Sequence, residues 1–100
     1  FSKVSFRDSY LRKASLSGTD LESADLRGAD LSGADLGLAK LSEANFSGAN
    51  LRGVNLSEAN LSEANLTDTD LTGADLKNVK NPQFCRTKTS IGIMNPDCRD

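Results

Sequence analysis

A large apolar residue occupies every fifth position of this 100-residue chain from Phe1 to Leu76, without a slip. Residues 24–28 read Ala-Asp-Leu-Arg-Gly and residues 59–63 read Ala-Asn-Leu-Ser-Glu. A small apolar or hydroxyl residue stands two places before the large one, and the other three places are polar. A helix is excluded, because at ~100° per residue successive leucines would be rotated by ~140° and no apolar face would form. A plain strand is excluded as well, because it needs alternation at a period of two.

Positions two apart do share a face of a short extended segment, so Ala24 and Leu26 can both point inward. If the chain bends the same way after each such pair, it closes into a coil with a filled apolar lumen. Glycines stand two places after the large residue, where unusual dihedrals are expected, at Gly18, Gly28, Gly33, Gly48, Gly53 and Gly73. Stacked coils then pair as parallel ladders about 4.8 Å apart.

The large residues are therefore predicted to be buried, and the residue after each of them is predicted to be exposed. This core ladder consists of Phe6, Leu11, Leu16, Leu21, Leu26, Leu31, Leu36, Leu41, Phe46, Leu51, Leu56, Leu61, Leu66, Leu71 and Leu76.

The five-residue blocks resemble the pentapeptide repeat family, whose pattern is A(D/N)LXX, over about four-fifths of the chain. The resemblance implies an all-β fold, a right-handed quadrilateral parallel β-helix with one block per side. A coil then takes about 20 residues, which gives about four coils. Residues 1–80 are expected to form this β-helix and residues 81–100 a short, partly helical C-terminal cap.

Stacking at 20 residues places the residues that precede the large ones in columns. One column reads Tyr10, Asp30, Asn50, Asp70; the next reads Ser15, Asp35, Asn55, Asp75; a third reads Asp20, Lys40, Asn60, Lys80. Asn separates the aspartates in the first two columns and opposite charges are neighbours in the third. Since like charges directly opposite each other are destabilising, this spacing favours four sides over three.

The repeat stops after Leu76. Asn81 and Pro82 are typical of an N-cap and a first helical position, which predicts a short helix through about Arg86. Phe84 is the predicted plug of the open lumen. Gly92 and residues 95–96, Asn-Pro, are predicted to mark turns.

The segment around Cys85 and Cys98 resembles the disulfide-closed C-terminal cap of extracytoplasmic pentapeptide repeat proteins in cyanobacteria and chloroplasts. The resemblance implies a disulfide between these cysteines, which are thirteen positions apart with turn formers between them. Cystines persist in oxidising compartments, so the expected location is the thylakoid lumen or the periplasm. A free thiol pair in a cytosolic protein is the alternative.

Charge is unevenly distributed along the chain. Residues 1–16 carry net +3, residues 17–76 carry eleven acidic and three basic residues, net −8, and residues 77–100 carry net +3. Neither end is basic or aromatic enough to predict direct nucleic-acid binding. The chain has no His and two Cys, so no metal site, cofactor or enzyme activity is expected.

Two functions are left open. The first is a non-catalytic structural or protein-interaction module with an unknown protein partner. Its specificity would lie in the outward residues Glu22, Arg27, Glu43, Arg52, Glu58, Glu63 and Asp68. The second is a DNA mimic that inhibits an enzyme such as gyrase, as some acidic members of the family do. Six of the eleven central acids precede the large residue, where the repeat itself requires Asp or Asn, which counts against mimicry.

The sequence has no initiator Met and no signal sequence, so any targeting segment is expected outside it. No stretch approaches the ~20 apolar residues of a membrane span. The N-terminal end of the rod has no visible cap, which leaves either a monomer or a dimer that packs through this end. Leu38 departs from the repeat as an apolar residue in an outward corner, where it is either incidental or part of a contact surface.

Overall fold

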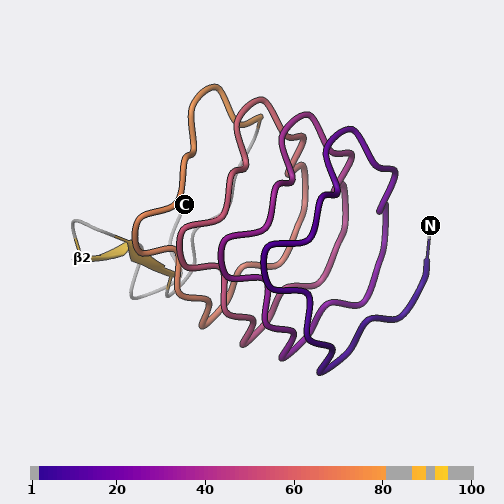
Figure 1. The fold of residues 1–100 in the computed structure, drawn as a ribbon, viewed down its shortest axis with the longest axis horizontal. Helices are drawn as coiled ribbons and strands as arrows, with labels where there is room; N and C mark the ends of the chain where they lie inside the picture. Colours follow the sequence, from indigo (N-terminus) through magenta and orange to yellow (C-terminus); the bar gives the residue numbers. More distant parts are fainter. Residues whose placement is uncertain (1–2, 81–86, 90–91, 95–100) are drawn as a thin grey trace.

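The computed structural model describes residues 3–80, 87–89 and 92–94. Residues 3–80 wind into stacked coils in which residues twenty positions apart pair as parallel bridges (Figure 1). The bridges begin with Ser5 and Asp25 and end with Asn60 and Lys80. Four blocks therefore make one coil, and the three columns predicted from the sequence are confirmed as bridged stacks.

Three backbone hydrogen bonds per block join each coil to its neighbours. The Leu26 N–H donates to the Asn45 carbonyl at 2.8 Å, and the Asn45 N–H donates to the Ala24 carbonyl at 2.9 Å. The Gly28 N–H donates to the Ser47 carbonyl at 3.2 Å. Each side of the coil is thus held as a short parallel ladder, and a single bridged residue per block replaces the long strand of an ordinary sheet.

A β-turn bends the chain after every large residue. The Ala29 N–H donates to the Leu26 carbonyl at 3.1 Å, and the same bond recurs block after block. The second residue after each large one, which we call the corner position, has a positive φ in every turn, as in a type II turn. Glycine occupies six corners with φ of 66–76°, which confirms the role predicted for these glycines. The other ten corners have φ of 57–62° without glycine.

The lumen is filled by the large residues and by the small residue two places before each of them. Every large residue from Leu21 to Leu71 is at most 1% exposed. Phe6, Leu11, Leu16 and Leu76, in the terminal coils, are only half-buried, because they have a neighbouring coil on one side alone.

The prediction that the residue after each large one is exposed was too simple. Several of these residues are half-buried and Gly37 is buried, because they lie against neighbouring side chains. Ser32, for example, donates its hydroxyl to Asp30 Oδ1 at 2.8 Å.

Two short strands follow the coils, β1 (Thr87–Thr89) and β2 (Gly92–Met94), which pair in antiparallel register. They lie at the end of the stack opposite the N-terminus (Figure 1). Gly92, predicted to mark a turn, is instead the first residue of β2, where it pairs with Thr89 next to the connection between the strands. The predicted helix from Asn81 to about Arg86, the plug Phe84 and both cysteines lie outside the described residues.

Candidate interaction surface

The surface of the coils begins with the Asp or Asn that precedes each large residue, which we call the capping position. Four of the five N–H groups in a block have backbone partners, but the N–H of the residue after the large one points away from the ladder. The capping side chain supplies its acceptor: Asn50 Oδ1 accepts the Arg52 N–H at 3.1 Å, and Asp75 Oδ1 accepts the Lys77 N–H at 3.0 Å. A backbone donor left unpaired is costly, which explains why the repeat requires Asp or Asn there.

All six aspartates at capping positions in residues 17–76 make this bond, namely Asp20, Asp25, Asp30, Asp35, Asp70 and Asp75. Their carboxylates are therefore engaged in local turn geometry. Six of the eleven central acids therefore have a structural role in the turns, which explains why the repeat requires Asp or Asn before the large residue.

In the second column, a side-chain hydrogen bond joins an Asn and an Asp of adjacent coils. Asn55 Nδ2 donates to Asp35 Oδ1 at 3.2 Å, across one coil spacing. Gly37 lies against this pair: a Cβ there would meet Asp35 Oδ1 at 3.2 Å, Asn55 Nδ2 at 3.3 Å and the Ser57 hydroxyl at 3.5 Å. A side chain at residue 37 would therefore have to displace this pair by a few tenths of an ångström.

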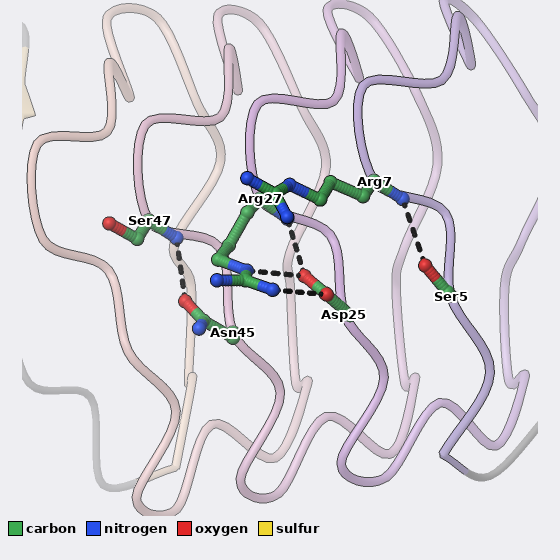
Figure 2. A network of polar contacts seen from close by, with 6 residues as sticks. All are labelled: Ser5, Arg7, Asp25, Arg27, Asn45 and Ser47. Carbon is green, nitrogen blue, oxygen red and sulfur yellow. Dashed lines mark hydrogen bonds and ion pairs between the residues drawn. The ribbon is translucent and has the colours of Figure 1, made fainter.

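One ion pair stands out on the side that carries Ser5, Asp25 and Asn45 (Figure 2). Arg27 holds Asp25 with two side-chain bonds, Nε to Oδ1 at 2.9 Å and Nη2 to Oδ2 at 2.8 Å. The side-chain hydrogen bond from Arg27 lowers the pKa of Asp25 to about 2, with help from the Arg27 N–H. Because both side chains are partly exposed to solvent, water screens this pair and its contribution to stability is small.

The arginines and the glutamates lie on different sides of the coil, although lysines and aspartates occur on both. A count of charge along the chain does not show this arrangement. Among the described residues, Arg7 and Arg27 share one side, and Arg12 and Arg52 share the next. The glutamates flank the side that carries the Asp20–Lys40 column, at Glu22, Glu43, Glu58 and Glu63. Counting residue numbers in steps of twenty would have revealed this arrangement.

The outward residues assigned to specificity lie on this surface. Glu22, Glu43, Arg52, Glu58, Glu63 and Asp68 are exposed, and Arg27 is half-buried by its pairing with Asp25. They are distributed over several sides of the coil and do not converge on one site.

The corner column Gly18, Leu38, Glu58 and Asn78 contains the clearest irregularity. Leu38 is 61% exposed and has a φ of 60°. Below it, on the adjoining coils, lies a hollow of about 330 Å³ lined by Ser57, Glu58, Asp75, Lys77 and Asn78.

The described residues contain no group of three or more His, Cys, Asp or Glu placed to hold a metal ion. In the same part of the chain, Thr69 is the one buried polar residue, and its hydroxyl donates to the Leu66 carbonyl at 2.8 Å. No helix long and apolar enough to cross a membrane occurs in the described ranges.

Coils of twenty residues, a turn after each apolar residue and parallel bridges between coils define a four-sided parallel β-helix. Residues 1–37 and 39–78 match the family described as Pentapeptide repeats, in eight copies. The chain belongs to the pentapeptide repeat family, whose members form right-handed quadrilateral β-helices. Leu38 is the residue between the two matched stretches.

Solved structures of this family resemble the chain. A pentapeptide repeat protein from the Arabidopsis thaliana thylakoid lumen superposes with a TM-score of 0.82 at 32% identity, over 87% of this chain and 62% of that one. Rfr23 from the cyanobacterium Cyanothece 51142 is 34% identical over 81% of this chain and 59% of its own, with a TM-score of 0.48. HetL, involved in heterocyst differentiation regulation in Nostoc sp. strain PCC 7120, is 32% identical over 91% and 47%, with a TM-score of 0.47.

The chain thus spans less than two thirds of each of these three proteins. A comparison with curated proteins finds no match.

Proposed function

We propose that the protein is a non-catalytic interaction module of the thylakoid lumen or periplasm, a rigid support that presents outward side chains to a protein partner. The observation that carries the proposal is that some positions of each block serve the fold and others face solvent. The small, capping and large positions are used for the lumen and for hydrogen bonds. The residue after the large one and the corner residue face outward and vary in size and charge.

A rigid support suits this role, because side chains on an ordered backbone lose less freedom on binding than those on a flexible loop. In the described coils, no buried side-chain nitrogen or oxygen lacks a partner. The proposal includes no cofactor and no reaction. The 32%-identical relative from a thylakoid lumen supports the compartment.

The proposal includes a C-terminal cap at residues 81–100, closed by a disulfide between Cys85 and Cys98 and plugged by Phe84. The half-buried Leu76, Ala74 and Val79 form the end of the lumen that such a plug would cover. We keep residues 1–80 as the β-helix and residues 81–100 as the cap. The proposal allows two oligomeric states, a monomer and a dimer that packs through the N-terminal end of the β-helix.

Inhibition of gyrase by DNA mimicry is the alternative that we disfavour. Six of the eleven central acids cap turns. The remaining five form no single column, because only Glu43 and Glu63 are stacked one coil apart. A phosphate-like track would need a continuous row of free carboxylates. In a supercoiling assay at low salt, the protein should leave gyrase active. Inhibition at micromolar protein that is lost in a Glu58→Gln/Glu63→Gln variant would favour mimicry.

The partner can be sought by immobilising the protein and passing a lumenal or periplasmic extract over it. A triple variant, Glu43→Gln/Glu58→Gln/Glu63→Gln, changes outward charge without touching the lumen and serves as the matched comparison. A defined protein retained by the wild type, then purified and shown to bind with lower affinity to the triple variant, supports the proposal. A substrate turned over by the isolated domain contradicts it.

A further inference from the structure

We draw no further inference here: the strongest candidate, the open end of the first coil, where Phe6, Leu11 and Leu16 are only half-buried, carries no proposal because nothing in the structure shows what covers it.

Discussion

The first coil and the inner coils are built from the same repeat but are supported differently. In the inner coils, Leu51 is fully buried and Asn50 caps the next turn. In the first coil, Leu11 is half-buried, and the capping position before it is Tyr10, whose side chain is 88% exposed. The comparison teaches that a repeat residue contributes according to its neighbouring coils, as expected of a one-dimensional stack.

The largest difference between the first coil and the inner coils is expected when a leucine of the lumen is truncated. Leu51→Ala removes a buried side chain between two coils and should cost about 2–5 kcal/mol of unfolding free energy. Leu11→Ala, the same change in the first coil, should cost roughly half as much, because part of the side chain is already in solvent. Urea denaturation of both variants measures the difference. Equal losses would show that the first coil is covered as completely as the inner ones.

The second test compares the opposite end with the inner coils. If Cys85 and Cys98 form the proposed disulfide, closing the loop should stabilise the cap by ~3 kcal/mol. Reduction should then increase hydrogen exchange at residues 81–100 and leave the amides of the inner coils protected, because repeat stability comes from nearest neighbours.

Thiol counting on the unreduced protein is the control for that experiment. Two free thiols would refute the disulfide. Loss of hydrogen-exchange protection throughout residues 3–80 on reduction would show that the cap stabilises the whole β-helix.

A third test changes the capping position in one column of the stack. Asn50→Ala leaves the Arg52 N–H without its acceptor and should cost about 1 kcal/mol, as for a lost helix cap. Tyr10→Asn places a side-chain acceptor at a capping position where the Tyr ring supplies none. It should raise the free energy of unfolding by up to about 1 kcal/mol. Arg52→Ser, which keeps the cap, should change stability by less than about 0.5 kcal/mol. A neutral Asn50→Ala would mean that water serves the N–H equally well.

The smallest effect concerns pH. Arg27 holds the pKa of Asp25 at about 2, below its ordinary value of 3.8, so the carboxylate stabilises the fold above about pH 4. That contribution is lost as the pH falls from about 4 towards 2, through the folded-state pKa. The stability difference between wild type and Asp25→Asn should therefore shrink over this range.

Carboxyl titration by NMR checks the cause of the shift. In Arg27→Ser, the pKa of Asp25 should return towards 3.8, although Asp25 Oδ1 still accepts the backbone N–H of residue 27. An unchanged pKa would assign the shift to the backbone bond alone.

Much of the fold could be predicted from the period of five. The columns headed by Tyr10 and Ser15 were correct because a solenoid converts sequence spacing directly into spatial neighbours. The role of the corner glycines was likewise predictable, because only a turn requires positive φ at one place in five. The exposure of residues after the large ones was not predictable, since Gly37 and Ser32 lie against side chains of their own block and of the adjoining coils.

The sequence alone determined the inward and outward sides of every block, because the alternation of apolar and polar residues leaves one way to bury the leucines. It did not determine why Asp or Asn precedes each leucine, since the unpaired N–H that they cap exists only once the turn has formed. The tertiary structure alone decided that Gly37 is buried against the side chains of Asp35, Asn55 and Ser57. The stacking of coils brings Asn55 and Ser57 to it, and no local preference of these residues does so.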